Sequence, residues 1–429
     1  MRFLKEGESG FDQYLSEVER RAIRDNLRFE KEVRSILLDI EKRGDKALLY
    51  YIKRFDGLCI SVDQLRVKRS EIKKAYQKIP QEFLKTLKRS AHRIHTFHKH
   101  TMKRYSVHLR EKGILLGRVM RPLERVGIYV PGGKASYPST VLMSAIPAKV
   151  AGVSTLVMAT PPHQGGVNPA VLVAADLAGV DQIYQIGGAH AIAAMAYGTE
   201  SIPKVDKIVG PGNQYVATAK RLVYGVVDVD MVAGPSEILI LSDGKSPAHF
   251  IASDLISQAE HDERALAILI TTSEAHGQEV KREIERQLSL LHRKEIARES
   301  LKKRGAILVV HHLRRAIELA NRISPEHLEL CIENPSKYVN AIKHAGALFL
   351  GSYTPEAIGD YMAGPNHILP TGGTARFSSP LSVEDFIKWT NLMRFDQRAL
   401  KQFAKDLKRF TVMEGLEGHF KAIQMRVEG

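Results

Sequence analysis

The chain has 429 residues, 44% of them hydrophobic, which is enough for two or more domains that each bury a core. It contains no run of 18 apolar residues and acidic side chains occur early, so we expect neither a membrane span nor a secretory signal. Its two cysteines, Cys59 and Cys331, are too few for a disulfide framework. We expect each to be a small buried hydrophobe in a protein of the reducing cytoplasm.

The net charge of +15 comes almost entirely from residues 1–125, which hold 31 Lys and Arg against 17 Asp and Glu. The other residues hold 32 against 31 and are nearly neutral. The basic residues follow helical spacing and lack the glycine and aromatic pattern of an RNA-recognition motif. We interpret them as a solvated helical face; the alternative is a non-catalytic protein that binds nucleic-acid phosphates.

Residues 1–58 are predicted to be helical, and a further helix follows Pro80. This second helix carries His92, His95 and His98, and His100 lies just beyond it. Lys and Arg are interleaved with them and neither a carboxylate nor a cysteine joins them. We therefore interpret the histidines as part of a basic helix face in preference to a metal site.

From about Arg121 short β-rich runs alternate with helical stretches. Strands are predicted at residues 126–130, 155–158, 182–186, 207–209, 238–241, 267–271, 306–310, 327–331 and 347–350. This rhythm indicates parallel sheets that helices cover on both faces. We predict an α/β fold with two doubly wound, Rossmann-like parallel-sheet domains and helical N-terminal and C-terminal extensions, the chain being helical again from Ser382.

Glycine-rich loops follow three of these strands, at residues 131–133, 187–188 and 210–213. Backbone that approaches a phosphate or a flat cofactor closely needs residues without a Cβ atom. None of the loops has the full dinucleotide fingerprint with its following acid. A dinucleotide site and ordinary tight turns both remain open.

A carboxylate and an imidazole stand side by side at Glu326 and His327, just after Pro325. Pro325 keeps the preceding residue out of helical geometry, and a strand is predicted to begin here. We expect this loop-to-strand junction to carry the chemistry, as sheet edges do in open α/β folds. The two groups suit proton transfer, and a solvated surface pair is the alternative.

Side chains that suit a zinc ion occur in separate segments: Gln258, His261, Asp360 and His419. Together they offer two imidazoles and two oxygens, a set that Zn²⁺ or a similar ion accepts. Spacing alone does not bring such distant segments together, and surface histidines that bind no metal, in a metal-free α/β binding module, are the alternative.

With these motifs in view, the sequence resembles the histidinol dehydrogenases. The matching segments run in family order, at residues 126–133, 206–213, 233–237, 258–261, 324–329, 359–367 and 414–419. The resemblance implies a cytoplasmic homodimer with shared active sites and one zinc per subunit. It implies oxidation of L-histidinol to L-histidine through L-histidinaldehyde with two NAD+, and neither a specific nucleic acid nor a membrane as partner. The alternative is a related zinc- and NAD-dependent enzyme acting on another small alcohol, such as a sulfonated diol.

The resemblance also implies roles for single residues. Zinc would be held by Gln258, His261, Asp360 and, from the other subunit, His419. These ligands would contact the substrate together with Ser236, His327, His367 and Glu414. NAD would be contacted by Tyr129, Asn213 and His190, where the family usually has Gln. His327 would take the hydroxyl proton, and Glu326 would activate the water that adds to the aldehyde.

Four parts of the chain are expected on the same basis. Residues 1–25 would form a helical arm. Residues 26–120 and 237–378 would form the first α/β domain, with most of the zinc and substrate site. Residues 121–236 would form the Rossmann-like domain on the NAD side. Residues 379–429 would form a helical segment exchanged between subunits.

Overall fold

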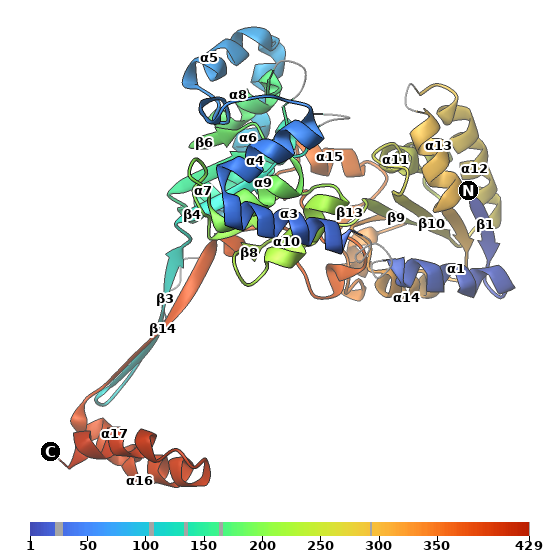
Figure 1. Cartoon of the computed structure of the whole chain (residues 1–429). Coiled ribbons are helices and arrows are strands. Elements are labelled where there is room, and N and C mark those ends of the chain that lie inside the picture. Colours follow the sequence, from blue (N-terminus) through green and yellow to red (C-terminus); the bar gives the residue numbers. More distant parts are fainter. Residues whose placement is uncertain (22–28, 103–106, 133–135, 163–165, 292–293, 429) are drawn as a thin grey trace. The chain divides into compact units, whose positions relative to one another are not determined.

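The computed structural model describes residues 1–21, 29–102, 107–132, 136–162, 166–291 and 294–428 (Figure 1). The chain divides into two compact units. One contains Met1–Thr101 with Glu124–Phe386, and the other contains Met102–Leu123 with Ile387–Gly429.

A parallel sheet in the larger unit carries the predicted catalytic pair. Its described strands have the order β1-β11-β10-β9-β12-β13. They are β1 (Arg2–Lys5), β9 (Glu237–Ser242), β10 (Leu266–Thr271), β11 (Ala306–Val309), β12 (His327–Cys331) and β13 (Ala347–Leu350). Successive side chains of β9 enter opposite cores, Leu239 on one face and Ile240 on the other.

Helices cover both faces of this sheet, as expected of a buried parallel sheet (Figure 1). One face packs against α1 (Ser9–Glu19) and α14 (Leu313–Ile323). The other packs against α11 (Ala248–Ala259), α12 (Glu274–Leu288) and α13 (Lys294–Lys303). The short 3-10 segment Pro335–Ala341 and helix α15 (Glu356–Tyr361) flank β13 in the sequence.

A second parallel sheet has the described order β6-β5-β4-β7-β8. Its strands are β4 (Arg125–Tyr129), β5 (Thr155–Ala159), β6 (Gln182–Tyr184), β7 (Lys207–Val209) and β8 (Asp228–Val229). Its helices are α7 (Pro138–Ala151), α8 (Pro169–Leu177), α9 (Gly188–Tyr197) and α10 (Gln214–Val223). The predicted α/β fold with two helix-covered parallel sheets is therefore confirmed.

The N-terminal region differs from the prediction in two ways. The arm begins with β1, which pairs with β11 in parallel as the edge strand of the first sheet. Helices α3 (Glu30–Arg43) and α4 (Asp45–Tyr51) share a core with the second sheet, whereas we had assigned this region to the first α/β domain. The amphipathic spacing predicted these helices correctly but carried no information about which sheet they cover.

The rest of the N-terminal region is mostly helical. It contains the π-helix η1 (Ile52–Asp56), the 3-10 turn η2 (Val62–Gln64), α5 (Arg69–Lys78) and α6 (Gln81–Thr101). Of the four histidines on α6, His98 is buried and does not belong to the solvated face that we had predicted. Cys331 is buried as expected, but Cys59 is exposed, so that prediction was wrong for Cys59. None of the described helices is long and apolar enough to cross a bilayer.

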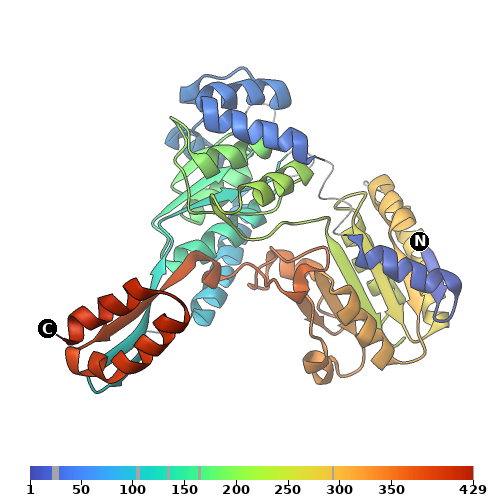
Figure 2. The same ribbon diagram turned by 60° about the horizontal axis from the view of Figure 1, so that its bottom comes forward.

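The smaller unit contains strands that the sequence analysis missed. An antiparallel sheet of order β14-β3-β2 joins β2 (Val107–Glu111), β3 (Ile114–Pro122) and β14 (Ile387–Phe395) (Figure 2). Two helices follow it side by side, α16 (Gln397–Met413) and α17 (Glu417–Val427). The expectation of continuous helix after Ser382 was therefore wrong for residues 387–395. The strand partners lie far apart in the sequence, and local periodicity does not reveal such pairing.

Candidate active site

The predicted catalytic pair lies between α14 and β12. Helix α14 ends at Ile323, and the following Ser324 has a left-handed φ of 51°, which turns the chain away from the helix. Pro325 follows, and β12 begins at His327. The pair therefore lies at the amino end of a parallel strand. Open α/β sheets usually carry their chemistry at the carboxyl ends of the strands, so the location of this pair differs from the one that we expected.

The backbone of Glu237, on the neighbouring strand β9, contacts both members of the pair. Its N–H donates a hydrogen bond to Glu326 Oε2 at 2.8 Å, and its carbonyl oxygen lies 2.8 Å from His327 Nδ1. A carbonyl accepts only, so Nδ1 of His327 carries the proton. The Nε2 atom is then left as the basic nitrogen.

Burial shifts the pKa values of the pair in opposite directions. Only 6% of Glu326 and 4% of His327 are exposed. Burial raises the pKa of the Glu326 carboxyl well above its usual range, although the N–H of Glu237 opposes the shift. Burial lowers the pKa of the His327 imidazole, although the Asp360 carboxylate opposes it. His327 is therefore a neutral base near neutral pH, and the solvated-surface interpretation is excluded.

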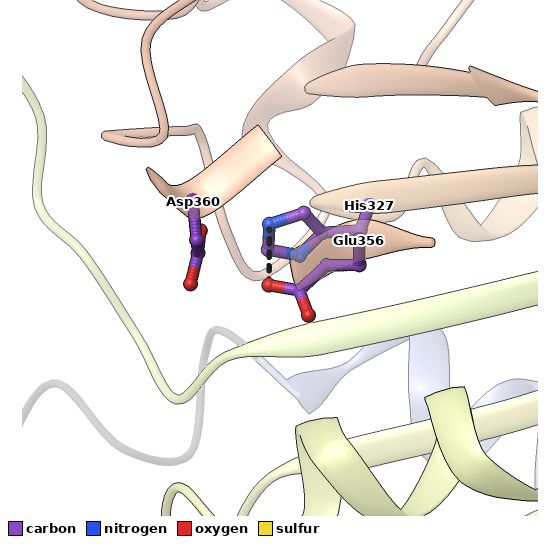
Figure 3. A group of neighbouring side chains, drawn as sticks. All are labelled: His327, Glu356 and Asp360. Carbon is purple, nitrogen blue, oxygen red and sulfur yellow. Dashed lines mark ion pairs between the residues drawn. The ribbon is translucent and has the colours of Figure 1, made fainter. Parts of the chain in front are cut away.

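Two carboxylates from α15 join His327 in a cluster (Figure 3). One ligand atom from each of His327, Glu356 and Asp360 lies within 4.8 Å of the others, and His327 Nε2 is 3.8 Å from Glu356 Oε1. Glu356 and Asp360 are four residues apart and so lie one helical turn apart. That spacing was the signal for Glu356, which the sequence analysis overlooked.

The two acids of α15 differ in charge. Burial, followed by the neighbouring Asp360 carboxylate, raises the pKa of Glu356 to about 9. Burial alone would raise the pKa of Asp360, but hydrogen bonding with His367 and the nearby imidazoles, His261 among them, lower it below its usual value. His367 Nδ1 lies 3.4 Å from Asp360 Oδ1 and 3.0 Å from its carbonyl oxygen. Near neutral pH, Asp360 is therefore the anion and Glu356 the neutral acid.

An unpartnered buried amide is the observation that bears on the expected metal ligands. The side-chain amide of Gln258 is fully buried, and neither of its polar atoms has a hydrogen-bond partner among the described residues. Such an orphaned amide is costly unless it binds something. His261 follows one turn later, and its N–H donates to the Gln258 carbonyl at 3.3 Å. The unpartnered amide of Gln258, the His261 imidazole and the Asp360 carboxylate are donors of the kind that zinc accepts, whereas His419 and Glu414 lie exposed in the smaller unit.

A cavity of about 770 Å³ adjoins the cluster, with His327, Asp360 and His367 on its wall. The last turn of α6 lines another part with Phe97, the buried His98 and Thr101. This volume is in the range of sites for small molecules and cofactors.

The residues expected to contact NAD lie around the second sheet. Tyr129 is buried, and its hydroxyl accepts a hydrogen bond from the N–H of Gly188 at 3.0 Å. His190 is 1% exposed, stacks on Phe55 of η1 and lies 3.5 Å from the Asp56 carboxylate. Segment η1 therefore covers His190 in this structure.

The loops expected to approach a cofactor have structural roles too. Gly210 has a φ of 109°, and a Cβ atom there would lie 2.1 Å from the Tyr129 carbonyl oxygen, so close packing requires glycine. The Asn213 side chain caps α10 by accepting from two backbone N–H groups. Gly133 lies outside the described residues. Ser236 directly precedes β9, and its carbonyl oxygen accepts from the Leu266 N–H at 3.0 Å.

Comparison with known proteins decides the family. A family model described as "Histidinol dehydrogenase" matches residues 19–427. The chain belongs to the histidinol dehydrogenase family. A histidinol dehydrogenase from Bacillus cereus is 53% identical over 399 residues, covering 93% of this chain and 92% of the relative. One from Geobacter sulfurreducens is 51% identical over 430 residues and covers 100% of both chains.

A solved member of the histidinol dehydrogenase family has the same fold. The crystal structure of histidinol dehydrogenase from Elizabethkingia anophelis has a TM-score of 0.92 to this chain at 36% identity. The match covers 100% of this chain and 98% of that structure.

Proposed function

We propose that this chain oxidises L-histidinol to L-histidine through L-histidinaldehyde, reducing two NAD+ for each histidinol. Membership of the histidinol dehydrogenase family supports this proposal. The structural observation that carries it is the orientation of His327. Its Nδ1–H is held by the Glu237 carbonyl, which leaves a neutral, basic Nε2 at the cavity wall beside Asp360.

His327 would act as the base for the alcohol carbon. Its Nε2 accepts the hydroxyl proton while hydride leaves for NAD+. The lowered pKa keeps the imidazole unprotonated near neutral pH, so the base is ready before substrate binds.

Glu326 would serve the second half of the reaction. A carboxyl with a raised pKa is a stronger base once it loses its proton, and it can take a proton from the water that adds to the aldehyde. The resulting hydrate would be oxidised at the same carbon to give the carboxylate. Retaining a reactive aldehyde between the steps requires a closed site, consistent with a pair that is more than nine-tenths buried.

Zinc would be held by Gln258, His261, Asp360 and His419 of the partner subunit. When bound, zinc supplies a fixed point for the imidazole and amine of histidinol, which orients the alcohol carbon. The further substrate contacts that we propose are Ser236, His367 and Glu414. Those that we propose for NAD are Tyr129, His190 and Asn213. We also propose a cytoplasmic homodimer with shared sites and neither a specific nucleic-acid nor a membrane partner.

Turnover tests the activity directly. Purified protein supplied with zinc should produce two NADH for each L-histidinol consumed, with L-histidine as the product. NADH formation from a sulfonated diol but not from histidinol would overturn the proposal.

Metal binding can be tested separately from activity. Gln258→Met removes the orphaned amide while keeping a similar volume, so the metal-free variant should be at least as stable as the parent. Zinc at about a thousand times its dissociation constant should stabilise the parent by roughly 4 kcal/mol and the variant far less. Thermal denaturation with and without zinc measures both. An equal shift in the two proteins would exclude Gln258 as a ligand.

A further inference from the structure

A buried ion pair lies behind the catalytic pair. Arg21 follows α1, and its Nε and Nη2 atoms donate to the two carboxylate oxygens of Glu237 at 2.5 and 2.8 Å. Each side chain is 4% exposed. The planar guanidinium matches the carboxylate in this two-bond arrangement, so the pair has a defined orientation as well as charge complementarity.

Arg21 also contacts the backbone that leads into the catalytic pair. Its Nη2 donates to the carbonyl of Ile323 at 3.0 Å, and its Nη1 donates to Val18 within its own segment at 2.8 Å. Ile323 is the last residue of α14 and precedes the left-handed Ser324. One guanidinium therefore joins the end of α1, the end of α14 and the start of β9.

Glu237 connects this ion pair to the chemistry. Its N–H holds Glu326 and its carbonyl holds His327, each at 2.8 Å. Its side chain, besides binding Arg21, accepts from the N–H of Gly372 at 3.1 Å. A change in the side-chain anchor would move the peptide groups that fix both catalytic side chains.

We propose that Arg21 and Glu237 are positioning residues for the Glu326–His327 pair, an inference that rests on the proposed function of that pair. The N-terminal arm is then part of the support of the active site. A buried ion pair is weak evidence of stabilisation, since desolvation offsets much of the attraction. Its value here is geometric, because small displacements of catalytic groups slow a reaction strongly.

The test compares steady-state kinetics of variants of the full-length protein. Arg21→Gln and Glu237→Gln should each lower kcat for histidinol about a hundredfold, with KM within about twofold of the parent. The double variant, which leaves no unpaired buried charge, should lose no more than either single variant, because the two residues act as a unit. Arg21→Lys, which keeps the charge but cannot form the planar two-bond arrangement, should retain an intermediate kcat.

A matched control variant distinguishes a loss of positioning from a weaker attachment of the N-terminal arm. Glu19, two residues before Arg21, binds Arg322 of α14 at 2.5 Å. Glu19→Gln removes an ion pair that also attaches the end of α1 to α14, but it does not change the contacts of Glu237. Its kcat should stay within about twofold of the parent. An equal loss in Glu19→Gln, a normal kcat in Arg21→Gln, or independent losses that multiply in the double variant would each overturn the inference.

A spectroscopic measurement keeps this inference separate from the proposed function. In ¹⁵N-histidine-labelled protein, His327 should be the Nδ1–H tautomer in the parent and a mixture of tautomers in Arg21→Lys and the double variant. The His327→Gln variant assigns the signal. An unchanged tautomer in well-folded variants would overturn the positioning role, whether or not histidinol proves to be the substrate. Absence of turnover by the parent would overturn only the function.

Discussion

Burial acts differently on the ionisable side chains of the candidate site. It raises the pKa values of Glu326 and Glu356 and lowers that of His327, whereas neighbouring imidazoles keep Asp360 ionised. Environments that separate pKa values in this way are typical of acid and base assignments in enzymes. The surroundings of each side chain therefore indicate whether it is an acid or a base, which its residue type alone does not.

Replacing Glu326 should separate the two half-reactions. Glu326→Gln keeps a hydrogen-bond acceptor for the Glu237 N–H but removes the base for hydration, so aldehyde oxidation should slow about a hundredfold while alcohol oxidation changes much less. Single-turnover experiments with histidinol and with histidinaldehyde measure the two steps. Equal slowing of both would remove the role that we give to Glu326.

Glu356 should make the metal-free protein less stable as pH rises. Its pKa is about 9 in the folded chain and near 4.5 when unfolded, so the folded state binds more protons between these values and stability falls across that window. Glu356→Gln removes this dependence. At pH 7 the metal-free variant should be more stable than the parent by up to roughly 3 kcal/mol, and near pH 4.5 the two should converge. Urea titrations at several pH values would show parallel curves if the carboxyl is ionised when folded.

Helix α6 connects the basic N-terminal region to the candidate site. The Ser90 hydroxyl donates to the Tyr361 carbonyl at 2.6 Å, and Arg93 Nη2 donates to the Ala363 carbonyl at 3.3 Å. These bonds hold the backbone between Asp360 and His367. At the scale of elements, α6 therefore supports the loop that follows α15.

His98 on α6 predicts a loss of stability in acid. Burial lowers its pKa to about 4, and neither ring nitrogen has a hydrogen-bond partner among the described residues. The unfolded chain, with a pKa near 6.5, binds more protons between pH 4 and 6.5, so the folded state loses stability as pH falls through that window. His98→Phe should recover about 2 kcal/mol of this loss at pH 4. Denaturant curves at pH 4 and 7 test it, and an unchanged pH dependence would contradict it.

At the scale of the whole molecule, the main question is what the smaller unit contacts. It exposes large apolar side chains on β14 and α16: Met393, Phe410, Val412 and Met413. It also carries Glu414 and His419, the proposed substrate and metal groups that the larger unit lacks. Exposed apolar side chains are what the proposed dimer would cover.

Mixing two inactive variants would test shared sites. If His419 completes the site of the partner subunit, a dimer of one His419→Gln chain and one His327→Gln chain has one intact site. Half of the dimers in an equal mixture are of this kind, so refolding the two together should recover about a quarter of the parent activity. Each variant refolded alone is the control. If the mixture gains nothing although mixed dimers form, His419 acts within its own chain.

The sequence alone determined the alternation of strands and helices in residues 124–350 and the proximity of Glu326 to His327. It did so because hydrophobic periodicity and covalent neighbours are local properties. The tertiary structure decided which sheet α3 and α4 cover, that β3 pairs with β14, and that the backbone of Glu237 contacts both Glu326 and His327. It also decided which carboxyls are neutral. Pairing between distant strands and the desolvation of a charge both depend on neighbours that only folding brings together.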